Sequence, residues 1–162
     1  VKNLASFNSK KEEATGKVNI LRTIDEVVQI SKAKLHALQI TLKIDCQADL
    51  EVNINSIEWQ QVLMNIVNNA IEALENQGTS EKVIQITARK RDYLIEILVD
   101  DSGPGISPGQ ELAIFNLMQT NKANGSGIGL WLSKNILEKH KGKIIAGNSP
   151  LGGACISIWL PA

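Results

Sequence analysis

Residues 65–74 read NIVNNAIEAL, and this stretch decides how the chain is interpreted. With about 100° of rotation per residue, it predicts an amphipathic helix with one apolar face. The apolar face carries Val62, Leu63, Ile66, Val67, Ala70 and Leu74. The opposite face carries Gln61, Asn65, Asn69 and Glu72, whose neighbours stack one turn apart. This polar face is either solvated or a binding surface.

The asparagines favour a binding surface. Asn65, Asn68 and Asn69 stand where lysine or glutamate would form a better helix. An amide oxygen is a neutral, hard ligand, which suits a Mg²⁺ ion already surrounded by phosphate oxygens.

A second motif follows a strand-like run, where residues 100–106 read DDSGPGI. Glycine permits positive φ and lets a ligand approach the backbone closely, as Gly103 and Gly105 would here. The Asp101 carboxylate could accept a hydrogen bond from an exocyclic amine such as the adenine N6. The alternative is an ordinary Asp-Ser-Gly-Pro turn.

A third motif lies at residues 124–136, which read NGSGIGLWLSKNI. Glycines that lead into a helix leave free N–H groups at its start, and such groups bind phosphate. The G-x-G-x-G pattern alone is weak, and it is not the dinucleotide-binding fingerprint, because no strand and short turn precede it. Lys122 lies just upstream and could reach a terminal phosphate, or it could be only a surface charge.

The order of these motifs is more specific than any one of them. An asparagine helix, D-x-G-x-G, a lysine-bearing loop with G-x-G-x-G, and a glycine pair before a final strand follow one another. From about Lys17 to Ala162, the chain resembles the GHKL ATPase superfamily, and specifically the catalytic domain of bacterial sensor histidine kinases.

The resemblance implies a site for ATP and Mg²⁺. NIVNNA resembles the N box, which makes Asn69 the metal ligand and Asn65 its neighbour with a catalytic role, shared with Lys122 at the γ-phosphate. DDSGPGI resembles the G1 box, with Asp101 on the adenine amine. The adenine ring would lie beside Gly103, Gly105 and Ile106. GSGIGL resembles the G2 box, which would close over the phosphates with Gly125, Ser126, Gly127, Ile128, Gly129 and Leu130.

Two departures from the family pattern carry information. Glu72 stands where many members have a basic residue, and NAIEAL with a T-x-K lid looks closer to the nitrogen-regulator class of sensor kinases. IFNLMQTNK resembles the F box, but Leu117 and Met118 stand where proline and phenylalanine are usual.

Asn65 also separates kinases from ATPases within the superfamily. In the gyrase, mismatch-repair and heat-shock chaperone branches, a glutamate at this place activates water. An amide has no useful basicity at neutral pH, so we expect slow hydrolysis and catalysis by positioning and charge neutralisation. Glu58 and Glu72 share the helix face and remain alternative bases.

The resemblance implies phosphoryl transfer to a histidine on an upstream dimerisation domain, and through the full-length kinase to a response regulator. Neither His36 nor His140 has the family's acceptor context, so we expect both to be structural. The alternatives are a nucleotide-sensing module without kinase activity and, disfavoured by Asn65, an ATP-hydrolysing clamp.

Composition agrees with one domain in a cytoplasmic setting. The 162 residues are 43% hydrophobic, enough for a core, and 17 basic residues balance 17 acidic ones. We therefore expect no nucleic-acid binding and no direct membrane contact, although the parent protein could be membrane-anchored. Cys46 and Cys155 are expected to be buried thiols, with no zinc site.

The element pattern predicts an α+β fold: a two-layer sandwich whose mixed, mostly antiparallel sheet is covered on one face by three helices. Residues 1–16 would be the tail of an upstream dimerisation helix, residues 17–162 the catalytic domain, and about 107–128 the ATP lid. We expect strands at 17–21, 40–46, 83–91, 93–100, 143–147 and 154–160. We expect helices from Thr23 to about residue 38, from the Asn55 cap to about residue 77, weakly near 111–117, and over about 129–141.

Overall fold

Helices separate pairs of consecutive strands along most of the chain in the computed structural model, which describes residues 14–78, 80–117 and 128–162. The strands are β1 (Gly16–Asn19), β2 (Thr41–Cys46), β3 (Glu51–Ile54), β4 (Val83–Arg91), β5 (Leu94–Asp101), β6 (Lys143–Asn148) and β7 (Ala154–Pro161). The helices are α2 (Ile20–Ala37), α3 (Ser56–Glu75), the 3-10 turn η1 (Ala113–Phe115) and α4 (Gly129–Lys139).

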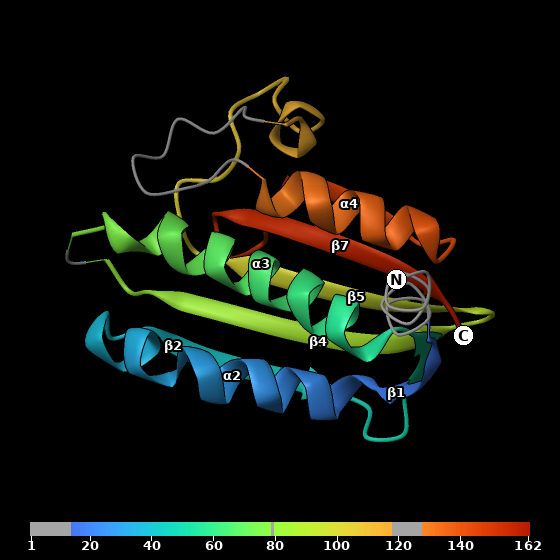
Figure 1. Ribbon diagram of the computed structural model, residues 1–162. Helices are drawn as coiled ribbons and strands as arrows, with labels where there is room; N and C mark the ends of the chain where they lie inside the picture. The colour runs from blue at the N-terminus through green and yellow to red at the C-terminus, as the bar shows by residue number, and fades with distance from the viewer. Residues whose placement is uncertain (1–13, 79, 118–127) are drawn as a thin grey trace, which may run out of the picture.

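Five strands form the main sheet in the order β2-β4-β5-β7-β6. Only the β2–β4 pair is parallel, and the other neighbours in this sheet are antiparallel. Helices α2, α3 and α4 all cover one face of this sheet (Figure 1). The predicted two-layer α+β fold is therefore confirmed.

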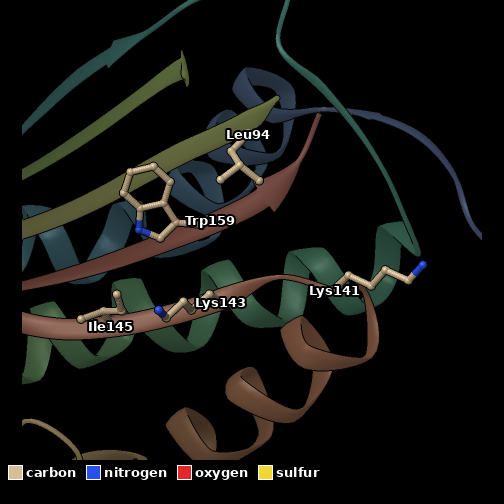
Figure 2. A pocket seen from close by; sticks show the side chains of 5 residues that line it. All are labelled: Leu94, Lys141, Lys143, Ile145 and Trp159. Carbon is tan, nitrogen blue, oxygen red and sulfur yellow. The ribbon is translucent and has the colours of Figure 1, made fainter. Parts of the chain in front are cut away.

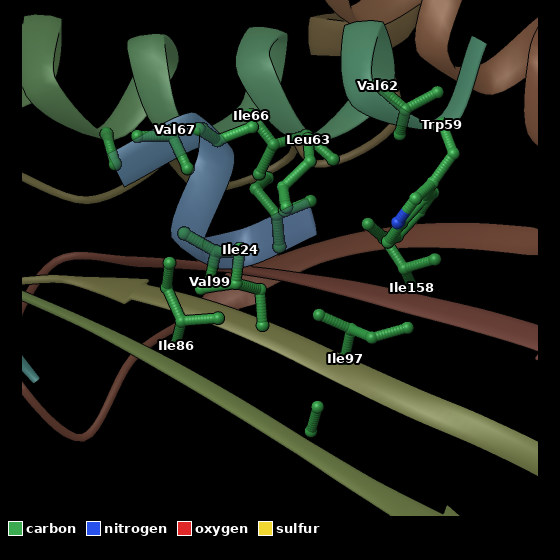
Figure 3. Packing of buried hydrophobic residues seen from close by; sticks show 14 of the residues in the cluster. Ile24, Trp59, Val62, Leu63, Ile66, Val67, Ile86, Ile97, Val99 and Ile158 are labelled. Atoms are coloured by element: carbon green, nitrogen blue, oxygen red, sulfur yellow. The ribbon is translucent and has the colours of Figure 1, made fainter. Parts of the chain in front are cut away.

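Helix α3 lies at the centre of the helical layer because its apolar stripe is almost completely buried. Figure 3 shows side chains of α3 pointing at those of β4, β5 and β7. Val62, Leu63 and Ile66 each have 0% exposure. At its start, Asn55 Oδ1 accepts hydrogen bonds from the backbone N–H of Ile57 and Glu58, as the predicted N-cap requires. The expected helix and its buried face are confirmed.

Helix α2 begins earlier than predicted. Asn19, not Thr23, is the N-cap, since Asn19 Oδ1 accepts from Arg22 N at 2.9 Å. Thr23 is buried, and its hydroxyl donates back to the Asn19 carbonyl. The strand predicted at 17–21 therefore ends at Asn19, because a better cap lies four residues upstream of the expected one.

Three further expectations need correction. The short strand β3 was not predicted; it pairs with β1 in a separate two-stranded sheet. The weak helix near 111–117 is only the 3-10 turn η1. Cys46 and Cys155 are unpaired thiols but only half-buried. Burial raises the pKa of Cys155 to about 11.

Parts of the predicted domain division fall outside the described residues. These parts are most of the 1–16 tail and residues 118–127 of the expected lid. In the part of the chain that is described, no helix combines the length and the apolar character needed to cross a membrane.

Candidate functional site

One face of α3 meets both glycine-containing loops. At one end, Asn65 Nδ2 donates to the Gly129 carbonyl at 3.2 Å. At the other end, a Cβ placed on Gly103 would lie 3.1 Å from the Ala73 Cβ, so the loop after β5 touches the helix. Asn69 lies one turn from each contact residue. With a rise of about 1.5 Å per residue, the two contacts are about 12 Å apart along the axis, with Asn69 midway.

The loop after β5 is built around Asp101. This side chain is 2% exposed, and its Oδ1 accepts N–H groups from Gly103 at 2.9 Å and Ala154 at 3.1 Å. The Asp101 carbonyl also accepts the N–H of Gly153. These bonds join β5 to the start of β7, and they set the orientation of the carboxylate.

Gly153 is a site residue that the sequence did not identify as one. A Cβ at this position would lie 2.2 Å from Asp101 Oδ1 and 2.5 Å from Gly103 N. No side chain fits in that space, so the close approach of the two loops depends on glycine. The Gly152–Gly153 pair was noted as part of the family pattern, and its spacing before the last strand was the available signal.

The second loop ends where α4 begins. Ile128 is the N-cap residue, and its side chain has no polar atom to cap the helix. First-turn N–H groups lack intrahelical acceptors, so such an end can receive an anion. Asn65 Nδ2 also lies 3.3 Å from the hydroxyl of Ser133, which is fully buried one turn into α4. Ser133 was likewise missed, because one serine in an amphipathic helix carries no signal in the sequence.

The remaining predicted residues divide into two groups. Gly105 has a φ of +80°, which only glycine adopts readily, and it lies against Gly153 and Asn148. Ile106 and Leu130 are half-buried against the core, whereas Ile128 is exposed. The expected ligands Lys122, Gly125, Ser126 and Gly127 lie outside the described residues, as does Met118 of the F box.

The two alternative bases, Glu58 and Glu72, lie at different positions along α3. Glu58 pairs with Lys139 at 2.6 Å, and it precedes Asn69 by 11 residues, or about 16 Å along the helix. Glu58 is therefore removed from the site. Glu72 lies within one turn of Asn69 and is half-buried.

The histidines lie away from the three motifs. His36 is exposed in the last turn of α2, which does not match the structural role expected for it. His140 is the C-cap residue of α4, as expected for a helix end. Burial lowers the pKa of His140, and the nearby Glu58 carboxylate only partly offsets this effect.

The donor set bears on which metal ion could bind. Within the described ranges, no group of three or more histidine, cysteine or carboxylate side chains could hold a metal ion. A neutral amide oxygen, such as that of Asn69, suits a hard cation that keeps water and phosphate oxygens as its other ligands, as Mg²⁺ does. It does not fit an ion that needs an all-protein cage.

A shallow groove lies on the other face of the sheet. Leu94, Lys141, Lys143, Ile145 and Trp159 line it (Figure 2). Trp159 lies between the core residues Ile158 and Leu160, so its side chain points away from the helices. The groove is at the far end of β7 from Ala154, and it is not part of the Asp101 site.

Comparisons with known proteins identify relatives of this chain. The sensor protein FixL of Bradyrhizobium diazoefficiens is 30% identical over 164 residues, covering 100% of this chain and 32% of the relative. The sensor histidine kinase ZraS of Escherichia coli K12 is 33% identical over 145 residues, covering 89% of this chain and 30% of the relative. The chain thus spans about a third of the length of these curated relatives.

The solved catalytic domain of the histidine kinase ThkA has a TM-score of 0.81 and 30% identity, over 91% of this chain and 95% of that domain. ThkA has also been solved in complex with the response regulator protein TrrA. The family model described as "Histidine kinase-, DNA gyrase B-, and HSP90-like ATPase" matches residues 54–162, which is more than half of the chain. The chain therefore belongs to the family of histidine kinase-, DNA gyrase B- and HSP90-like ATPases.

Proposed function

We propose that this chain binds ATP with Mg²⁺ along α3 and passes the γ-phosphate to a histidine on a separate dimerisation domain. The observation that carries this proposal is the spacing on one face of α3. Asn65 contacts the start of α4, Ala73 contacts the loop that holds Asp101, and Asn69 lies between them. A span of about 12 Å suits a nucleotide whose base is at one end and whose phosphates are at the other.

Each end has a defined task in this proposal. The Asp101 carboxylate accepts the exocyclic amine of adenine, and Gly103, Gly105 and Ile106 make room for the ring. Asn69 supplies a metal ligand beside the phosphates. The first-turn N–H groups of α4 receive phosphate oxygens, and the G2 residues and Lys122 neutralise the γ-phosphate. Bound Mg²⁺ supplies charge stabilisation to the transferring group.

Position 65 favours transfer over hydrolysis. An amide cannot take a proton from water at neutral pH, and Glu58 is too far along the helix to replace a base. Glu72, within one turn of Asn69, remains the alternative base. The γ-phosphate is then retained until an acceptor arrives. Catalysis rests on positioning and electrostatics, as in other phosphoryl transfers.

The wider assignment rests on the relatives. FixL and ZraS are a sensor protein and a sensor histidine kinase by name, and ThkA has been solved with a response regulator. We infer that the parent protein is a two-component kinase that phosphorylates a response regulator in the cytoplasm. Glu72 and the T-x-K lid favour the nitrogen-regulator class.

The direct test is transfer of labelled γ-phosphate to a dimerisation domain of the parent kinase, supplied as a separate protein. We expect Mg²⁺-dependent labelling of its histidine and only slow phosphate release without it. Nucleotide binding without labelling would instead indicate a sensing module, the reading that the altered F box favours. Fast phosphate release without any acceptor would indicate a hydrolysing clamp.

A further inference from the structure

Hydrogen bonds to α4 fix the orientation of the Asn65 side-chain amide. Gly129 offers a carbonyl, which can only accept, so the atom of Asn65 that faces it must be the donor Nδ2. The second acceptor of Nδ2 is the Ser133 hydroxyl, at 3.3 Å. Because these two acceptors are 2.8 Å apart, they lie on the same side of Nδ2 and share one of its N–H groups.

Ser133 holds this arrangement together. Its hydroxyl has 0% exposure and donates to the same Gly129 carbonyl at 2.8 Å, which leaves its lone pairs for Asn65. A hydroxyl can donate once and accept at the same time. Serine is therefore suited to bridge the carbonyl of α4 and the amide of α3 in a dry contact.

The chemical consequence concerns the remaining atom, Oδ1. Among the described residues, Asn65 Oδ1 accepts no hydrogen bond. A carbonyl oxygen repels phosphate oxygens and attracts a cation or the water bound to it. A carboxylate at position 65 could not donate to Gly129 and would place two acceptors against each other in this contact.

We propose that Ser133 is a positioning residue, which helps to hold the Asn65 amide with its nitrogen toward α4 and leaves its oxygen for the nucleotide site. Asn65 Oδ1 then acts through Mg²⁺ or its water shell. This inference rests on the proposed function. It assigns Ser133 a part in nucleotide binding that depends on the metal.

The test compares Ser133→Ala with Ser31→Ala in the whole chain. Ser31 is a matched control, since it is also a buried helical serine, 4% exposed, but its hydroxyl has no partner among the described residues. We expect Ser133→Ala to weaken Mg·ATP binding about three- to tenfold in calorimetry, from the loss of one buried hydrogen-bond bridge. Binding of ATP in excess chelator should not change, and Ser31→Ala should change neither affinity.

Two further measurements separate positioning from packing. Ser133→Cys retains a side chain that fills the site but forms weaker hydrogen bonds, so it should show a smaller loss of the same kind. In nucleotide-free protein, one of the two side-chain N–H signals of Asn65 should exchange slowly with solvent, and faster in Ser133→Ala. In an Asn65→Ala background, Ser133→Ala should have no additional effect on Mg·ATP affinity, because the group it positions is gone.

The outcomes distinguish the two proposals. If the unaltered chain takes up no Mg·ATP, the proposed function fails and this inference fails with it. If the unaltered chain binds and Ser133→Ala binds equally, only the role of Ser133 is wrong. The role of Ser133 would also be wrong if Ser133→Ala weakened ATP binding equally with and without Mg²⁺. The same holds if its loss of affinity simply added to that of Asn65→Ala.

Discussion

The two ends of the candidate site are built in different ways. At the Asp101 end, backbone N–H groups and close backbone contacts fix the carboxylate, and a Cβ on Gly153 would be only 2.2 Å from it. At the α4 end, the loop and α3 are joined by one side-chain amide and one hydroxyl. There, a Cβ on Gly129 would lie 3.4 Å from Asn65 Cγ, an ordinary contact.

The difference shows that one end depends on shape and the other on hydrogen bonding. At the Asp101 end, close packing leaves space for a flat ring of a ligand, and the protein there tolerates almost no added atom. A hydrogen-bonded contact can be rebuilt by a similar side chain and depends on donor and acceptor identity. Substitutions should therefore have larger and less specific effects at the Asp101 end.

The largest effect is expected for Gly153→Ala. The new methyl group would overlap Asp101 Oδ1 and Gly103 N, so β5 and β7 must separate. We expect a loss of about 3 kcal/mol in the free energy of unfolding and no measurable ATP binding. Urea denaturation and calorimetry measure the two effects. Gly147→Ala is the control, because a Cβ there meets nothing within 4 Å.

Asp101→Asn tests the chemistry of the same end without changing its shape. The amide oxygen can still accept from Gly103 and Ala154, but the amide nitrogen cannot accept from adenine. We expect ATP affinity to fall about 10- to 100-fold, with less preference for ATP over GTP.

Asp100→Asn makes the same substitution one residue earlier, on the opposite face of β5, and should leave nucleotide affinity unchanged. A variant Asp101→Asn that binds ATP and GTP as the unaltered protein does would contradict the adenine assignment.

Asn69→Asp tests the metal site in the middle of α3, between the two ends. A carboxylate attracts the metal ion but repels the phosphates, so the Mg²⁺ dependence of ATP binding should change. We expect about a tenfold shift in the Mg²⁺ concentration required for half-maximal binding. Asn68→Asp, about 100° round the helix, should give no shift. An identical Mg²⁺ dependence in both variants and the unaltered chain would remove Asn69 from the metal site.

The smallest effect is expected at His140, the C-cap residue of α4, which lies outside both ends of the site. Burial lowers the pKa of His140 below its ordinary 6.5, and Lys139 acts in the same direction while Glu58 opposes both. In the window between the lowered pKa and 6.5, the unfolded chain binds more protons than the folded one. Stability is therefore complete above this window and falls as the pH decreases through it.

Thermal unfolding between about pH 7.5 and 5.5 should show this loss as a lower Tm at the acidic end, which His140→Gln largely abolishes. Nucleotide affinity should be the same in His140→Gln and the unaltered chain. A pH response that persists in His140→Gln would assign it to other groups.

The sequence predicted the parts of the fold that repeat a local pattern. The stripe from Val62 to Leu74 predicted α3, and strand-like runs predicted β4, β5 and β7. It failed at β3, which is four residues long and depends on β1, and at the start of α2, where two possible caps compete. Such choices are decided by tertiary contacts that local propensity does not contain.

The same distinction applies to the site. Asp101, Asn65 and Asn69 could be found, because motif and spacing mark them. Gly153 and Ser133 could not be assigned, since their importance arises from distances to residues 52 and 68 positions away in the sequence. Only the folded chain places the glycine pair on Asp101 or the α4 hydroxyl on Asn65.

The most direct test of the account is calorimetry of the unaltered chain with ATP in millimolar Mg²⁺, repeated with GTP. We expect saturable binding of one ATP per chain, weaker binding when Mg²⁺ is chelated, and much weaker binding of GTP. No heat of binding for ATP, or equal affinity for ATP and GTP, would contradict the claim that α3 and its two loops form an adenine nucleotide site.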